Sequence, residues 1–166
     1  QANFEKAKKV AEGAAIMTNT EYSVQIFSAI WPTRGNRTLA EVTQKNVEMV
    51  GMPKWTEEEN NLAKALQRNL KSKEEGLHKE IAPLRESRQG ASSNDSGEVT
   101  WIVPTGRVTF PSNIPNIPAH HWAAGVAPAT SIAHKGAVAG AKVLAASVVD
   151  FLIDPKLVEE AKATFK

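Results

Sequence analysis

The sequence contains no cysteine among its 166 residues. This absence excludes disulfide scaffolds, zinc ribbons, thiolate metal sites and cysteine nucleophiles together. An excess of charge of one sign is missing too, since 20 lysines and arginines stand against 18 acidic residues, for a formal net charge of +2. Because no basic stripe concentrates this small surplus, the composition does not indicate nucleic-acid binding. We therefore expect no nucleic-acid partner.

Features of a secreted precursor or a membrane protein are scarce as well. The chain opens with QANFEKAKKV, which is polar and charged and shows no signal peptide. Its longest apolar stretch, residues 131–153, is interrupted by Lys135, Lys142 and Asp150. A membrane span needs about 20 residues nearly free of charge. The sequence therefore predicts a buried helix here and no membrane partner, and it leaves the compartment open with the cytoplasm favoured.

Charged residues are unevenly distributed along a chain of ordinary globular composition, with 42% hydrophobic and 23% charged residues. Residues 54–88 hold 15 charged residues in 35 positions, whereas residues 99–153 hold four in 55. The first stretch is typical of a solvated helical surface. The second is expected to be interior or to line a cleft.

Apolar spacing and capping residues predict the helices. Thr38 with Glu41 forms a candidate capping box, and Thr56 followed by three glutamates is typical of a helix start. Asp154 and Pro155 indicate the start of the last helix. The predicted helices cover residues 3–17, 38–50, 56–70, 131–153 and 155–165.

Two segments are predicted to be strands, so the expected fold class is α/β. Residues 20–31 alternate roughly between apolar and polar side chains, which is typical of a half-buried strand. The short run VTWIV at residues 99–103 is expected to be a strand buried on both faces, with residues 105–110 paired to it or to a neighbour. We expect a mobile loop over residues 85–97, and an ordered loop over 104–128, where five prolines lie.

Three of the four histidines are candidates for function. His78 lies in the charged middle of the chain and is expected to be a surface residue. His120 and His121 stand beside Trp122 in a proline-rich loop, where packing and a binding role are both open. His134 lies near the start of the long apolar helix, where the helix dipole keeps an imidazole neutral, as metal binding requires. Its side chain could equally serve only to satisfy the backbone hydrogen-bonding groups in the first turn of that helix.

Two carboxylates precede the predicted strand at 99–103. Asp95 and Glu98 flank Gly97 in SSNDSGEVTW. Such acids can bind or orient metals or act as general bases, and they can also simply cap a turn. The sequence contains no GxSxG, P-loop, GxGxxG, HExxH or CxxC motif that would indicate a particular chemistry.

Several longer segments carry a resemblance. They are EGAAIMTNTEYSV, VGMPKWTEEENNLAKALQ, SSNDSGEVTWIVPT, IPAHHWAAG and the stretch from TSIAHKG to the C-terminus. Together they resemble the aminobenzoyl-glutamate utilisation protein B group, which belongs to the dinuclear zinc amidohydrolases alongside aminoacylases and glutamate carboxypeptidases. The resemblance runs almost end to end, and its SGEVTW and AHKG segments are specific in combination.

The resemblance implies two domains and assigns residues to a site. Residues 1–31 would be the last helix and strand of an inserted α+β lid and dimerisation domain. Residues 32–166 would be the C-terminal part of a catalytic domain with a helix-flanked mixed sheet. His134 would bind a metal, and Glu98, with Asp95 and Gly97, would lie near the metals without binding them. His120 and Trp122 match an HxW signature of the group and are candidates for the substrate pocket.

The resemblance also implies a function. The chain would be the C-terminal part of a metal-dependent amidohydrolase that uses two divalent metal ions, zinc or manganese. Its substrate would be an N-acyl or N-aroyl amino acid amide, and it would form a homodimer through the lid. The family's early metal motif, its glutamate pair and its lid histidine have no counterpart here, so the chain alone is predicted to be inactive without the N-terminal part. The alternative is a non-catalytic module that docks onto a partner chain.

Overall fold

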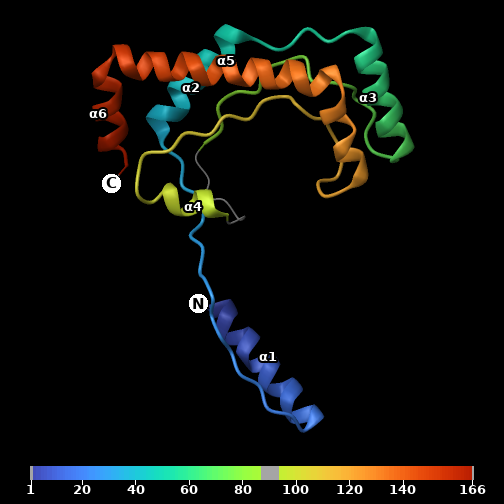
Figure 1. Cartoon of the computed structure of the whole chain (residues 1–166), viewed down its shortest axis with the longest axis vertical. Helices are drawn as coiled ribbons and strands as arrows, with labels where there is room; N and C mark the ends of the chain where they lie inside the picture. Colours follow the sequence, from blue (N-terminus) through green and yellow to red (C-terminus); the bar gives the residue numbers. More distant parts are fainter. Residues whose placement is uncertain (1, 87–93, 166) are drawn as a thin grey trace. The chain divides into compact units, whose positions relative to one another are not determined.

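The computed structural model describes residues 2–86 and 94–165 and is built from helices (Figure 1). The five longer helices begin and end close to the predicted positions, and α5 matches its predicted range at both ends. A five-residue helix and two short 3₁₀ helices were not predicted. The elements in chain order are α1 (Ala2–Thr18), α2 (Arg37–Val50), α3 (Glu57–Asn69), α4 (Asp95–Val99), η1 (Trp122–Gly125), η2 (Ala127–Ala129), α5 (Ser131–Ile153) and α6 (Pro155–Ala163).

The predicted α/β fold class is wrong: no strand or sheet occurs in residues 2–86 and 94–165. The mixed catalytic sheet and the lid strand are therefore both absent from the described part of the chain. A strand needs a neighbouring segment to accept and donate its backbone hydrogen bonds. Residues 20–31 find no such neighbour among the residues that the structure describes, and residues 105–110 form no regular element.

The predicted strand at 99–103 is instead the end of α4 and the turn that follows it. Its backbone bonds are local, since the amide of Trp101 donates to the carbonyl of Glu98 at 3.0 Å. Thr100 also donates its hydroxyl to the carbonyl of Gly97 at 2.5 Å. Thr100 is buried, but Ile102 is 74% exposed, so the segment is not buried on both faces either. The helix takes up part of the loop predicted over 85–97; residues 87–93 of that loop lie outside the described residues.

The chain divides into two compact units, Gln1–Ile30 and Trp31–Lys166. The first unit consists of α1 and the extended segment that follows it. Their junction is held by Thr20, whose amide donates to the carbonyl of Ala15 at 3.0 Å. The division falls one residue before the boundary predicted at 31/32. That the units are parts of a lid and a catalytic domain stays a prediction.

The second unit is organised around α5, the longest helix, with α6 following at one end and α3 near the other (Figure 1). Helix α2 packs along α5, and α6 packs against both. The contact between α2 and α5 has a polar centre, where the buried amide of Asn46 donates to Ser147 at 3.1 Å and to Asp150 at 2.6 Å. These bonds fix the register of the two helices.

Asn36, rather than the predicted Thr38, caps α2. Its side-chain oxygen accepts from the amide of Leu39 at 3.1 Å, and its side-chain nitrogen donates to the carbonyl of Ala161 in α6 at 2.8 Å. An amide side chain has an oxygen that can cap the helix and a nitrogen that can donate at the same time. Thr38 is the second residue of the helix itself, so it does not occupy the N-cap position. The cap of α2 thus also holds α6 in place.

The apolar core lies where α3, the 3₁₀ helices and the first turn of α5 meet. Its buried members are Ala63, Leu66, Leu77, Ile114, Ala123, Ala127 and Ile132. Trp55, Leu70, Ile117 and Val126 pack around them. This core fixes the first turn of α5 against α3 and so positions the residues that follow in α5.

Most of the rest of α5 is exposed. Its length and mean hydropathy of 1.8 would suffice to cross a membrane, a test that core helices of soluble proteins also pass, and only 22% of its most apolar window is buried. The prediction of a buried helix is therefore only partly right, because its far half has exposed apolar residues such as Leu144, Val148 and Leu152.

Candidate functional site

A pocket of about 470 Å³ lies between α5 and the loop that joins α2 to α3. One part of its wall is apolar, formed by Val50, Met52, Pro53, Val138 and Ala139. The other part carries His134 and the three lysines Lys54, Lys135 and Lys142. None of the lining residues is acidic. The pocket therefore combines an apolar surface with positive charge.

The spacing of residues along α5 places the histidine and one lysine in this pocket. His134, Val138 and Lys142 follow one another at intervals of four residues, and such positions share one face of a helix. In the sequence, Lys142 stands out only as an interruption of an apolar run. The spacing of four residues could have indicated that Lys142 shares a helix face with His134. No sequence pattern near Lys54 indicates that this residue, from a distant loop, lines the same pocket.

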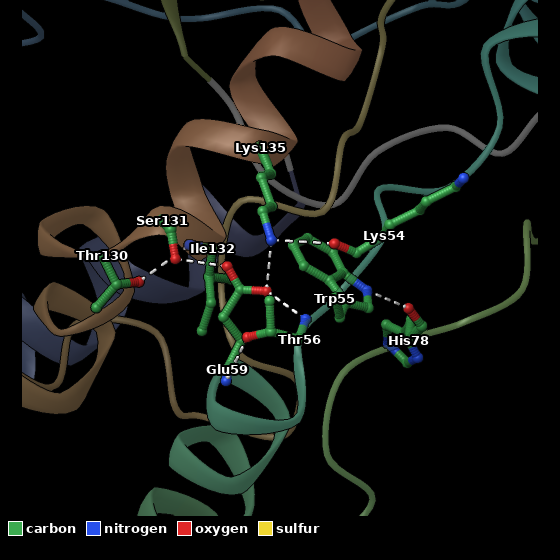
Figure 2. Close-up of polar contacts among 9 residues, drawn as sticks. All are labelled: Lys54, Trp55, Thr56, Glu59, His78, Thr130, Ser131, Ile132 and Lys135. Atoms are coloured by element: carbon green, nitrogen blue, oxygen red, sulfur yellow. Dashed lines mark hydrogen bonds and ion pairs between the residues drawn. The ribbon is translucent and has the colours of Figure 1, made fainter.

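Lys135 does not contribute free charge, because it is bonded to the next element. Its ammonium group lies 2.8 Å from the carboxylate of Glu59 in α3 and donates to the backbone carbonyl of Lys54 at 3.0 Å (Figure 2). The lysine thus ties α5 both to α3 and to the loop that forms the opposite wall of the pocket.

Glu59 is the centre of this network and is only 7% exposed. One oxygen accepts from the hydroxyl of Ser131 at 2.5 Å, and the other accepts from Lys135 and from the amide of Thr56 at 2.7 Å (Figure 2). The bond to Thr56 belongs to a capping box at the start of α3. One carboxylate therefore caps α3 and holds the first turns of α5.

The network also stabilises the charged form of Glu59. Burial by itself raises the pKa of this carboxyl, but hydrogen bonds from Lys135, Ser131 and the Thr56 amide, with the charge of Lys135, outweigh it and lower the pKa from 4.5 to about 2. The carboxylate is therefore ionised at neutral pH and compensates Lys135. In the described residues, no hydrogen bond or ion pair engages the ammonium groups of Lys54 and Lys142, so the pocket keeps a positive surplus.

The acidic residues singled out in the sequence lie elsewhere. Asp95 and Glu98 are exposed on α4 and do not line the pocket with His134. Gly97 is buried because the carbonyl oxygen of Trp31 approaches it so closely that a side chain would overlap it. Trp101 completes this contact by donating its ring N–H to the carbonyl of Pro32 at 2.8 Å. The glycine is thus explained by packing within the second unit.

The histidines of the HHW segment do not line the pocket with His134 either. His121 caps η1, since its Nδ1 accepts from the amide of Ala123 at 3.2 Å. Its ring lies tilted by 40° against the ring of Trp122, with the ring centroids 5.4 Å apart. His120 is exposed with a φ of +58°, and Trp122 is 65% exposed. His78 is exposed, as expected for a surface residue. His134 is the one predicted site residue that lines the pocket.

The described residues do not fit a complete metal centre. No group of three or more His, Asp or Glu side chains that could hold a metal ion occurs in the described ranges 2–86 and 94–165. A catalytic zinc takes three protein ligands. His134 is one exposed imidazole, so the geometry here supports no chemical step through a metal.

Comparison with known proteins relates the chain to one component of a hydrolase. The relative is a subunit of the p-aminobenzoyl-glutamate hydrolase of Escherichia coli (strain K12), to which the chain is 30% identical over 185 residues. The match covers 96% of this chain but only 38% of the relative, so the chain spans well under half of that protein's length. No family model matches the chain, and no solved structure matches it.

Proposed function

We propose that this chain forms part of a hydrolase that cleaves the amide bond of an N-aroyl or N-acyl amino acid, such as p-aminobenzoyl-glutamate. The observation that carries the proposal is the 30% identity that extends over 96% of the chain to a subunit of such a hydrolase. The placement among the dinuclear zinc amidohydrolases is part of the same proposal and rests on the sequence resemblance.

The pocket beside α5 is the part of the chain that supports a role at a substrate site. It places an imidazole, an apolar wall and three lysines around one space. Two divalent ions, zinc or manganese, would need ligands in addition to His134, and these would come from residues outside this chain. The chain's own residues would contribute this pocket wall, with Glu59 holding the turn of α5 that carries His134.

An assay of the full-length natural protein tests the proposal. Hydrolysis of p-aminobenzoyl-glutamate adds water across the amide and releases p-aminobenzoate and glutamate, which chromatography separates. We expect release of both products in equal amounts. A protein that is folded and metal-loaded, yet releases neither from this compound or from other N-acyl amino acids, would contradict the proposal.

The second candidate function is a non-catalytic module that docks onto a partner chain. Two observations favour it: Glu98 and His134 do not line one pocket, and the first unit exposes large apolar side chains. Met17 and Phe27 are 83% and 88% exposed. The relative is named as a subunit, which is consistent with partner chains. Association through this unit, as a homodimer, fits either candidate.

Light scattering of the full-length natural protein separates association from catalysis. The variant Phe27→Ser removes an exposed apolar ring without leaving a cavity. If the first unit mediates dimerisation, this variant is monomeric or dissociates at higher concentration than the parent. Glu12→Gln, an exposed polar change on α1, is the matched control. If the Phe27→Ser variant forms a dimer of unchanged stability, the dimer interface does not involve this part of the first unit.

A further inference from the structure

We propose that the pocket between α5 and the α2–α3 loop binds the acidic half of a dicarboxylic N-aroyl amino acid, with Lys54 and Lys142 pairing with its two carboxylates. This inference rests on the proposed function and adds to it the residues that select the substrate. Neither lysine belongs to the site that the sequence resemblance assigned. Three features of the pocket support the assignment: its charge, its apolar wall and its size.

The charge of the pocket favours an anion. Three lysines line it and no acidic residue does, while Glu59, just behind the wall, neutralises Lys135 alone. Lys54 and Lys142 come from two different elements that border the pocket, the α2–α3 loop and α5. Two ammonium groups carried by separate elements suit a ligand with two carboxylates better than a single compact anion, because each can pair with its own oxygen atoms.

The apolar wall indicates that the ligand is more than a small inorganic anion. Val50, Met52, Pro53 and Val138 present carbon surface to the same space. A hydrocarbon portion or an aromatic ring would be stabilised there by roughly 25 cal/mol for each Å² that it removes from water. The ligand chemistry that matches both parts of the pocket is an organic dicarboxylate with an apolar segment.

The volume of the pocket is compatible with such a ligand. Small-molecule sites are typically about 300–1,000 Å³, and this pocket measures about 470 Å³. Its shape is also supported from behind. Lys135 bonds to the carbonyl of Lys54, so the loop carrying one of the proposed lysines is tied to the helix carrying the other. The backbone of Lys54 is therefore held beside the helix that carries Lys142.

Substrate pairs that differ in one charge test the inference. The full-length natural protein would be assayed with p-aminobenzoyl-glutamate and with p-aminobenzoyl-glutamine, in which one carboxylate is a neutral amide. We expect the dicarboxylate to have a KM about tenfold lower, as loss of a charge-assisted hydrogen bond implies. In Lys54→Gln or Lys142→Gln the preference should disappear in at least one variant, with kcat changed much less than KM.

A lysine outside the pocket provides the control. Lys45→Gln in α2 changes net charge equally but does not touch the pocket, so it should keep the full preference. Equal KM values for both substrates in the parent, or a preference retained by both pocket variants, would overturn the inference while leaving the hydrolase proposal intact.

Binding measured without turnover keeps the two proposals distinguishable. Calorimetry with p-aminobenzoyl-glutamate, p-aminobenzoate and glutamate is independent of hydrolysis. We expect the conjugate to bind more tightly than either of its halves, and Lys54→Gln or Lys142→Gln to weaken the conjugate more than Lys45→Gln does. If the protein hydrolyses no amide but shows this pattern, the pocket assignment stands without the activity. If the conjugate does not bind, or binds all variants equally, the assignment fails.

Discussion

At the scale of single residues, Glu59 does the most to hold the site together. Its carboxylate accepts two hydrogen bonds from α5 and one from the N-cap residue of α3, and it is buried, so its charge depends on those partners. Removing one partner of such a network usually costs more than the pair contributes, because the remaining charge loses its compensation. Lys135 is 34% exposed at its side chain, which moderates this cost.

The stability of the protein should therefore depend on pH through Glu59. Its pKa is about 2 in the folded protein against 4.5 for an unperturbed carboxyl, so the stabilisation is complete above pH 4.5 and is lost as the pH falls toward 2. After allowance for solvent around Lys135, we expect about 2 kcal/mol from this residue. Denaturant unfolding at pH 7 and pH 2.5 measures it: Glu59→Gln should lose less stability on acidification than the parent.

A neighbour in the same turn serves as the matched control for this prediction. Glu58 is exposed, and Glu58→Gln should change the free energy of unfolding by no more than about 0.5 kcal/mol at either pH. Equal pH dependence in Glu59→Gln and the parent would show that the buried carboxylate is not the group that responds.

His134 is the residue whose loss should separate activity from stability. Its side chain is exposed in the pocket, so His134→Ala leaves little cavity, and we expect the free energy of unfolding to change by no more than about 1 kcal/mol. In the full-length natural protein, amide hydrolysis should be lost, since the resemblance assigns a metal ligand to this position. Activity, bound metal and melting temperature are measured side by side.

Substitutions of two other histidines serve as controls for that experiment. His78→Ala should leave activity unchanged, because the residue is exposed and does not line the pocket. His120→Ala should have at most a mild effect. Full activity and metal content in His134→Ala would remove the central residue of the proposed site and favour the docking module.

At the scale of elements, α5 is stabilised by close approach of irregular chain to its small residues. A side chain at Gly136 would overlap the carbonyl oxygen of Pro111, and one at Gly140 would overlap the ring of Phe110. The apolar face of α5 is therefore packed at these two positions by a loop rather than by another helix. Glycine is required here by contact, not by backbone conformation.

A pair of glycine substitutions tests this explanation. Gly136→Ala should destabilise the protein by about 1–3 kcal/mol, because a backbone carbonyl must move, even though alanine favours the helix by about 1 kcal/mol. Gly13→Ala in α1 meets open space and should keep that gain, raising the helicity of the first unit. Thermal unfolding and circular dichroism measure both. Stabilisation by Gly136→Ala would contradict the close approach.

Helix ends illustrate what local sequence can and cannot predict. Thr56 and the glutamates after it predicted the start of α3 correctly, because a capping box is made by residues three apart. The predicted cap at Thr38 was wrong by two residues, because Asn36 donates a second hydrogen bond to α6, which no local pattern reveals. The strand predictions failed for the related reason that pairing depends on distant segments.

At the scale of the whole molecule, the chain should not retain zinc by itself. A catalytic zinc takes three protein ligands, and in the described part of the chain no group of three suitable side chains comes together. We expect metal analysis of the purified 166-residue chain to find well below one zinc per chain. One tightly held zinc per chain would show that His120 or His121 joins His134 in a site that the geometry here does not bring together.

The sequence by itself determined the five longer helices and the relationship to a component of a hydrolase. Each of these helices is set by apolar spacing and capping residues that lie close together in the chain. The relationship is recognised from identical residues summed over the whole aligned length. Only the tertiary structure decided that residues 20–31 and 99–103 form no sheet. It also decided that Lys54 meets Lys142 across one pocket while Glu98 stays outside. The physical reason is that strand pairing, charge compensation and pockets arise from contacts between residues far apart in the chain, whose distances folding alone sets.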